Sequence, residues 1–175
     1  AVYTVVAREL AGSGRFTIEA LTGATGLSMG SVYHRFGSRE GLMAETWLDA
    51  VAQFQRQFMS ALAPGTLAAG LDAAMSIPRF CRTNRDQAIV LACCRQSEFV
   101  GDRTPSPLRH RIVSVNDEAS NAIKGFAKAV GRPLLACRLA LVAYPLGAVR
   151  LYLPHSKIPR TLDDEIAKAI RAALM

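Results

Sequence analysis

The sequence predicts an all-α fold, and three observations support this prediction. Apolar residues recur at intervals of three and four, which is the spacing of one face of a helix. No alternating run rich in valine, isoleucine and threonine indicates a strand. Glycine, proline and asparagine stand where the apolar periodicity stops, as they do at helix ends.

The predicted helices follow one another along the whole chain. The first extends from about Val2 to Ala11 and stops at glycine-rich residues 12–14. After two short helices, a long one ends at Pro64-Gly65 and carries an apolar stripe of Met43, Trp47, Val51, Phe54, Phe58 and Leu62. Pro78 and Pro145 fall inside later helices, where each is expected to kink the axis. These later helices are expected at about 66–83, 86–100, 107–130, 134–153 and 162–174.

The most informative segment extends from residue 16 to residue 42. Thr17 is expected to cap a short helix with its side-chain oxygen, and Leu21 and Ala24 are expected to face inward. Gly26 supplies the left-handed conformation that ends such a helix, and Leu27 then packs inward across a tight turn. These residues predict the first helix and the turn of a helix-turn-helix.

A second short helix follows directly. Ser28 is expected to cap it, and Val32 and Phe36, four residues apart, share its buried face. Gly37 ends this helix and Ser38 caps the long one. Two short helices joined by a turn that contains glycine form a helix-turn-helix, a common DNA-binding motif.

The chemistry of the second short helix suits DNA. A recognition helix needs slim or polar residues near its N-terminus to enter the major groove, and donors along its flank to hold phosphates. Tyr33 and His34 offer a hydroxyl and a ring N–H, and Arg39 with the first N–H groups of the long helix offers a second anion site. In the alternative interpretation, Tyr33 only packs and His34 is a solvated surface residue. The candidate DNA-binding residues are Thr17, Ser28, Met29, Gly30, Ser31, Tyr33, His34 and Arg39.

This segment resembles the TetR (tetracycline repressor) family of bacterial transcriptional regulators. The resemblance is carried by Thr17, Leu21, Gly26-Leu27-Ser28, Val32-Tyr33, Phe36, Ser38-Arg39 and Leu42, about a quarter of the chain. It implies a three-helix DNA-binding domain over residues 1–41 and a helical ligand-binding and dimerisation domain over residues 42–175. It also implies phosphate contacts from Tyr33 and Arg39. Met29 stands where such proteins often have Lys or Gln.

The resemblance further implies a homodimer on a palindromic double-stranded DNA operator. The predicted helix at about 134–153 is apolar on more than one side, so it needs two covering surfaces, and the helix at about 162–174 is expected to join it in the interface. Ile166, Ile170 and Leu174 are expected to face a second copy, which places two recognition helices on two half-sites. In the alternative interpretation, these helices form the core of a monomer.

A small-molecule effector of unknown identity is the other partner that the resemblance implies. The expected pocket residues are Trp47, Phe54, Phe58, Met75, Phe80, Cys93, Asn116 and Tyr144, with His110 or Arg150 as further polar contacts. Core packing is the alternative for each of them. The predicted function is a repressor that a small apolar ligand releases from DNA. The alternative is a helical small-molecule-binding or interaction protein with weak or lost DNA binding.

Charge and composition limit the other classes of function. The net charge is +7, but residues 1–50 carry four basic and five acidic side chains, so total charge does not locate a DNA-binding surface. The four cysteines show no metal-ligand spacing and no catalytic motif appears, so we expect no metal, no cofactor and no enzymatic activity. We expect no membrane span and a cytoplasmic location. Because the first residue is Ala1 rather than Met and the chain already opens within a helix, further N-terminal residues are expected. The resemblance implies that these can include a basic arm before the first helix.

Overall fold

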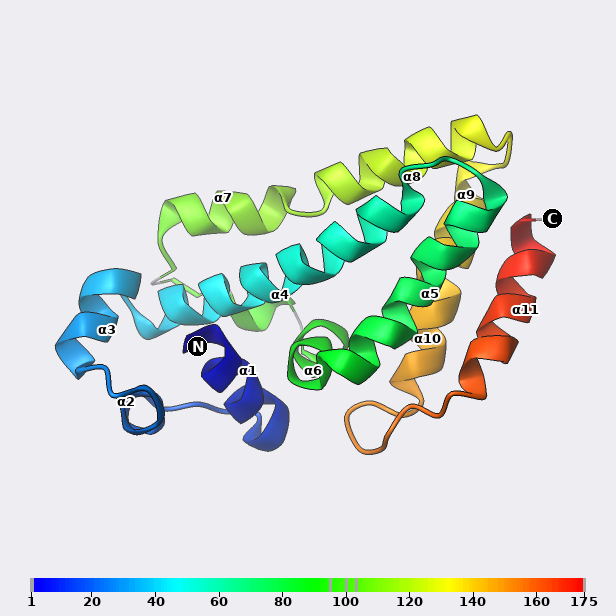
Figure 1. The fold of residues 1–175 in the computed structure, drawn as a ribbon. Helices are drawn as coiled ribbons and strands as arrows, with labels where there is room; N and C mark the ends of the chain where they lie inside the picture. Colours follow the sequence, from blue (N-terminus) through cyan, green and yellow to red (C-terminus); the bar gives the residue numbers. More distant parts are fainter. Residues whose placement is uncertain (1, 95, 100, 103, 175) are drawn as a thin grey trace. The chain divides into compact units, whose positions relative to one another are not determined.

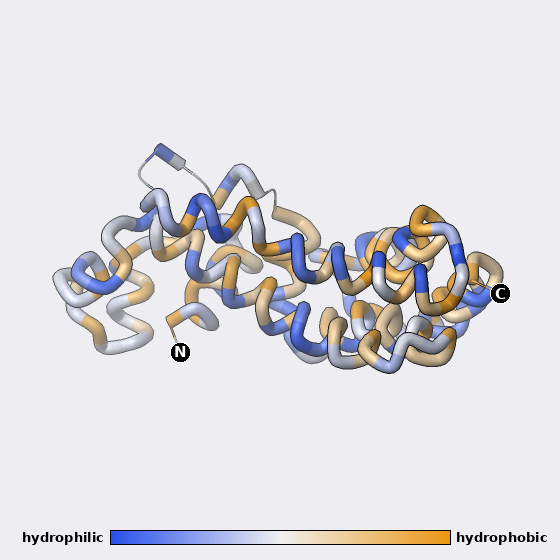
Figure 2. Tube along the Cα trace, turned by 90° about the horizontal axis from the view of Figure 1, so that it is seen from above, coloured by the Kyte–Doolittle hydropathy of each residue, from blue (hydrophilic) through white to orange (hydrophobic). Residues whose placement is uncertain are grey.

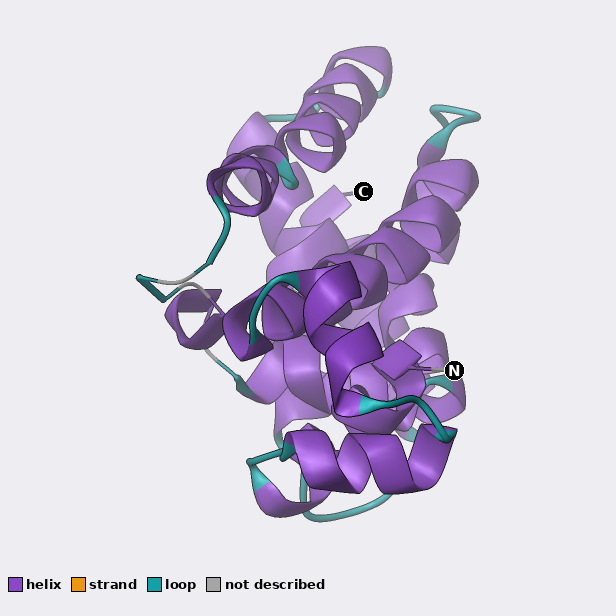
Figure 3. Cartoon of the chain, turned by 90° about the vertical axis from the view of Figure 1, so that its left-hand side faces the viewer, coloured by secondary structure: helices purple, strands orange, loops and turns teal. Residues whose placement is uncertain are grey.

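The computed structural model describes residues 2–94, 96–99, 101–102 and 104–174, and its regular elements in these ranges are all helical (Figures 1 and 3). The predicted all-α class is therefore confirmed. None of these helices is long and apolar enough to cross a membrane. The helices are α1 (Val2–Ser13), α2 (Ile18–Thr25), α3 (Met29–Phe36), α4 (Arg39–Leu62), α5 (Leu67–Thr83), α6 (Arg85–Cys93), the 3-10 helix η1 (Gln96–Phe99), α7 (Ser106–Ser114), α8 (Asp117–Ala129), α9 (Leu134–Arg138), the π-helix η2 (Leu139–Ala143), α10 (Tyr144–Arg150) and α11 (Leu162–Leu174).

The chain divides into two compact units. The first contains residues 1–51 and 86–115, and the second contains residues 52–85 and 116–175. This division differs from the boundary expected after residue 41. The difference arises because the first half of α4 and the segment from α6 to α7 contribute to the same core as the first three helices.

The core of the first unit joins its short helices to α4. Each short helix contributes only a few apolar side chains to this core, so most of the other residues of these helices stay in contact with water. Hydrophobic and hydrophilic residues accordingly alternate along these helices (Figure 2). The ring of Tyr3 meets Phe36 edge to face at 6.1 Å between centroids, and Trp47 packs on Phe99 at 6.2 Å. The largest fully buried side chains of this core are Val6, Leu21, Val32, Leu42, Val90, Phe99 and Ile112.

The core of the second unit forms where α5, α11 and the segment from α9 to α10 pack together. Phe58 of α4 and Phe126 of α8 are buried in it, and Gly70 of α5 lets the Phe126 ring approach closely. A Cβ atom at position 70 would collide with that ring. α5 begins at Thr66, whose hydroxyl accepts a hydrogen bond from the Ala69 N–H at 3.1 Å.

Ile166, Ile170 and Leu174 of α11 belong to this core and are at most 2% exposed. The expectation that they face a second copy is therefore wrong. The apolar stripe of α11 packs against α5 and η2 of the same chain. Amphipathicity shows that one face of a helix is covered, but not which chain covers it.

Two of the predicted helices are interrupted. The helix expected at 107–130 is broken at Val115-Asn116 into α7 and α8, and the Asn116 side chain accepts a hydrogen bond from the Gln55 amide at 3.1 Å. Asp117 and Glu118 then occupy the first turn of α8, where carboxylates interact favourably with the helix dipole. The helix expected at 86–100 ends at Cys93, and η1 follows.

The helix expected at 134–153 contains a change of backbone geometry. α9 passes into the π-helical turn η2 and then into α10, which contains Pro145 near its start. Proline has no N–H to donate to the preceding turn, and π turns are one way in which a helix accommodates such a loss. A π turn therefore lies directly before the helix that contains Pro145, and the kink expected at this proline stays a prediction.

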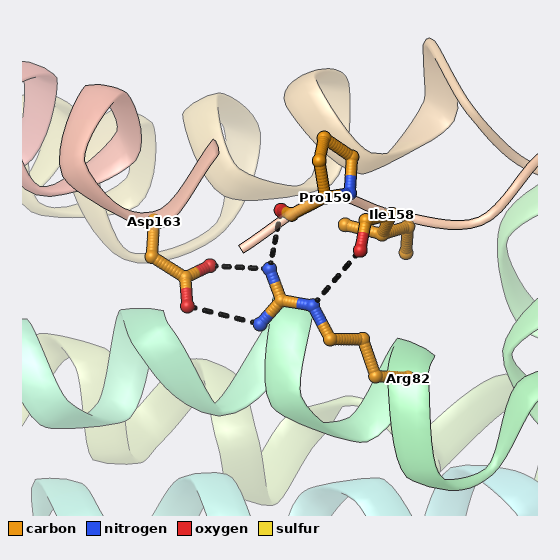
Figure 4. Close-up of polar contacts among 4 residues, drawn as sticks. All are labelled: Arg82, Ile158, Pro159 and Asp163. Atoms are coloured by element: carbon orange, nitrogen blue, oxygen red, sulfur yellow. Dashed lines mark hydrogen bonds and ion pairs between the residues drawn. The ribbon is translucent and has the colours of Figure 1, made fainter. Parts of the chain in front are cut away.

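Arginine side chains at the end of α5 and at the start of α6 hold the loop that precedes α11. Arg82 donates to both carboxylate oxygens of Asp163, at 2.9 and 2.6 Å, and to the backbone carbonyls of Ile158 and Pro159 (Figure 4). Arg85 donates to the carbonyls of Pro154 and Ser156. The paired geometry with Asp163 uses the planar fork that distinguishes arginine from lysine.

Replacing Arg82 with alanine should destabilise the protein because it leaves Asp163 and two carbonyls without their donor. The side chains of Arg82 and Asp163 are only 21% and 31% exposed. We expect a loss of about 2 kcal/mol in the free energy of unfolding, measured by urea denaturation followed by circular dichroism.

Arg79→Ala is the matched control on the same helix. Its partner is Asp72, and both side chains are more than half exposed. Exposed ion pairs contribute about 0–1 kcal/mol, so this variant should lose much less stability. Equal losses in the two variants would contradict the role assigned to Arg82.

Candidate nucleic-acid interface

α2 and the turn after it have the predicted geometry. The Thr17 hydroxyl accepts a hydrogen bond from the Ala20 N–H at 3.1 Å and so caps α2. Gly26 ends α2 in the left-handed conformation, at φ 71°, and its N–H bonds to the Thr22 carbonyl at 2.9 Å. Leu21 is buried as expected, whereas Ala24 is exposed. The inward assignment of Ala24 is wrong because α2 is only two turns long and buries Ile18 and Leu21 instead.

α3 is fixed by its cap and by two buried side chains. The Ser28 hydroxyl accepts a hydrogen bond from the Ser31 N–H at 3.1 Å, and the two serine hydroxyls lie 2.9 Å apart in a second hydrogen bond. Val32 and Phe36 are buried, as predicted. Gly37 ends the helix, and Ser38 accepts from the Gly41 N–H at 2.9 Å at the start of α4.

The remaining side chains of α3 point to solvent. Met29 and Tyr33 are 47% and 45% exposed, and Gly30, Ser31 and His34 are exposed as well. Because residues four apart share a face, Met29 and Tyr33 lie on one flank of α3, and Gly30 and His34 lie on the next. Thr17 and Ser28, at the starts of α2 and α3, are also exposed. The structure thus brings most of the predicted DNA-binding residues to one exposed helix and its cap.

Arg39 has a structural contact that the sequence did not predict. Its Nε and Nη2 atoms donate to the Phe16 carbonyl, at 3.4 and 3.1 Å, and its guanidinium lies 4.7 Å from the centre of the Phe16 ring. Phe16 directly precedes Thr17, the cap of α2. Arg39 therefore ties the start of α4 to the start of α2. No local sequence signal connects two residues that are 23 positions apart.

The formal charge is distributed unequally between the two units. The first unit contains eight basic and eight acidic residues, whereas the second contains thirteen and six. The entire net charge of +7 is therefore that of the second unit. The helix-turn-helix stands on a unit without net charge, so any attraction to phosphates must come from individual side chains rather than from a basic domain.

No protein-family model matches the chain, and searches of curated proteins and of solved structures likewise return no match.

The eight residues predicted to line an effector pocket are divided between the units. Trp47 and Cys93 belong to the first unit, and Cys93 is exposed. In the second unit, the Phe54 ring packs on Phe58 at 5.8 Å and on Phe80 at 5.5 Å. These rings contact one another, as in the core-packing alternative. Met75 is half-buried, whereas Asn116, bonded to Gln55, and Tyr144 are exposed. The further candidates His110 and Arg150 are exposed too.

A pocket that the sequence analysis did not predict lies between the end of α4 and α8. Its volume is about 350 Å³, and none of the eight predicted residues lines it. Ala122, Gly125 and Ala129 recur at intervals of three and four on α8, so small residues leave the space beside Met59 and Leu62. The spacing of these small residues on one face of α8 is the feature of the sequence that could have predicted the pocket. The lining residues are Met59, Leu62, Ala63, Gly65, Ala122, Gly125, Phe126 and Ala129.

The environment of Cys94 disfavours the thiolate form of its side chain. Burial, followed by the nearby Glu98 carboxylate, raises the pKa of the Cys94 thiol, whereas a nucleophilic cysteine needs a lowered pKa. Cys81 and Cys137 are buried. Across the part of the chain that the structure describes, no group of three or more potential ligands is placed to hold a metal ion.

Gly26→Ala should destabilise the helix-turn-helix, because a side chain at φ 71° is strained. We expect a loss of about 1 kcal/mol in the free energy of unfolding, measured by chemical denaturation. Gly23→Ala is the matched control within α2. A Cβ at position 23 meets nothing within 4 Å, and alanine is the better helix former, so this variant should gain up to about 1 kcal/mol. A change of the same sign in both variants would contradict this account of the turn.

Proposed function

We propose that the chain is a TetR-type transcriptional regulator that binds double-stranded DNA through α3. The observation that carries the proposal is the capped, eight-residue α3, which buries only Val32 and Phe36 and exposes its other residues. Gly30 and Ser31 in its first turn are slim enough for close approach to a major groove, and Tyr33 and His34 supply donors on its exposed side.

The proposal includes a homodimer on a palindromic operator. A two-fold dimer presents two copies of α3 to two half-sites, which is the usual way in which a single short recognition helix achieves specific binding. Leu135 and Leu151 support an interface in the predicted region, residues 134–153, because they are 69% and 80% exposed. Of the α11 surface, only residues outside its buried stripe are available for such an interface.

The proposed regulation is release from DNA by a small apolar molecule. The support for it is the pocket between α4 and α8, since apolar concave sites bind ligands of this kind. Ligand binding lowers DNA affinity only if the ligand prefers a conformation that binds DNA less well. The proposed effector site therefore differs from the one predicted from the sequence, which consisted largely of aromatic residues.

A second candidate function is supported by the charge distribution. The helix-turn-helix unit has no net charge, and Arg39 is already bonded to the Phe16 carbonyl. Both observations favour a helical small-molecule-binding or interaction protein with weak or lost DNA binding. In that case α3 is a structural part of the first unit and the pocket is the functional site.

The salt dependence of DNA binding distinguishes the two functions. A regulator that contacts phosphates releases counterions, and about four contacts reduce affinity roughly a hundredfold between 50 and 200 mM salt. We expect a decline of this size for a mixed-sequence duplex, measured by fluorescence anisotropy. Absence of binding at 50 mM salt would reject DNA binding and favour the second candidate. A measured affinity that does not change with salt would reject the proposed phosphate contacts of α3.

Tyr33→Phe should weaken binding to all duplexes by a similar factor, because a phosphate contact carries no sequence information. Loss of one hydrogen bond to a charged group corresponds to a roughly tenfold weaker affinity, and the dimer loses one in each half-site, so we expect a roughly hundredfold weaker affinity in total. Tyr152→Phe, in the second unit, is the matched control and should bind as the unchanged protein does. An unaltered affinity in the Tyr33 variant would exclude a phosphate contact from its hydroxyl.

A further inference from the structure

The first turn of α3 presents only one side chain long enough to reach a base. Gly30 has no side chain. The hydroxyls of Ser28 and Ser31 are hydrogen-bonded to each other at 2.9 Å, and that of Ser28 also caps the helix. Met29 remains, 47% exposed at the first position of the helix. Any contact between this turn and a base is therefore made mainly by the thioether side chain of Met29.

The first turn of α3 lacks the side chains that make the commonest base contacts. Guanine is read by the paired donors of arginine or by lysine, and adenine by the paired groups of asparagine or glutamine. None of these residue types occurs among residues 28–31. Arg35 is in the last turn of α3, where its guanidinium lies 5.3 Å from the centre of the Phe36 ring. Residues at the N-terminus of a recognition helix, rather than its last turn, contact base edges.

One group on the major-groove edge of the bases is apolar, namely the C5-methyl of thymine. We propose that Met29 is a specificity-determining residue that packs against the methyl group of a thymine in each half-site, an inference that rests on the proposed function. Tyr33 lies four residues further along the same flank and is 45% exposed. Its ring extends the apolar surface beside Met29, while its hydroxyl remains directed to the phosphates. A methionine side chain is flexible and polarisable, so it adapts well to such a methyl group.

The test replaces thymine with deoxyuridine, which removes the methyl group and keeps every hydrogen-bonding atom. The probe is a duplex recovered by selection from a random DNA pool, with each thymine of a half-site replaced in turn. At one thymine per half-site, we expect affinity to fall about fourfold, the value for one buried methyl-sized group. At the same position, a pair carrying 5-methylcytosine should bind more tightly than one carrying cytosine.

Met29→Ala is the decisive variant, because alanine is favourable in a helix and the position is exposed. It should bind the thymine and deoxyuridine duplexes equally. Val113→Ala is the control, since Val113 of α7 is 78% exposed and belongs to the same unit but lies outside the interface. It should retain the fourfold preference for thymine.

The outcomes separate this inference from the proposed function. If the protein binds the selected duplex and no thymine replacement changes its affinity, the role of Met29 is overturned and DNA binding stands. The same conclusion follows if Met29→Ala keeps the full preference for thymine. If no duplex is bound or recovered at any salt concentration, the proposed function fails, and this inference fails with it.

Discussion

The burial of Val32 and Phe36 is the constraint on which the proposed interface depends. Helices as short as α2 and α3 are not stable alone in water, so they exist here because their few apolar side chains enter a core shared with α1 and α4. Fixing these two residues also fixes the rotation of α3 about its axis. Every other residue of α3 then has an assigned direction, because successive side chains are 100° apart. The first turn and the flank that carries Met29 and Tyr33 face outward as a consequence.

Local signals in the sequence predicted the helix ends well. Thr17, Gly26, Ser28 and Ser38 act within three or four residues of themselves, so their identities were sufficient to place the caps and the turn. The breaks and the packing partners depend on residues far apart in the chain. Asn116 meets Gln55, and Arg39 meets Phe16, without any periodic pattern that connects them. For the same reason the amphipathic pattern of α11 does not show that its buried stripe packs within its own unit rather than against a second copy.

Individual side chains, through their shape and chemistry, support the proposed function. Total charge is a poor guide, because the positive charge belongs to the unit without the helix-turn-helix. The aromatic residues proposed as pocket walls were a similarly indirect signal, since Phe54, Phe58 and Phe80 fill space with one another. A pocket arises instead where α8 carries small residues opposite Met59. For both the DNA-binding surface and the pocket, the contacts of a residue in the structure indicate its role better than its residue type does.

Selection of bound duplexes from a random DNA pool tests the central claim most directly. The account predicts that an unchanged protein enriches one palindromic sequence, with half-sites about one helical turn apart or a multiple of that distance. It also predicts that each half-site contains one thymine whose methyl group packs against Met29. A folded protein that enriches no sequence would contradict the claim that α3 reads DNA, and the pocket between α4 and α8 would become the functional site to pursue.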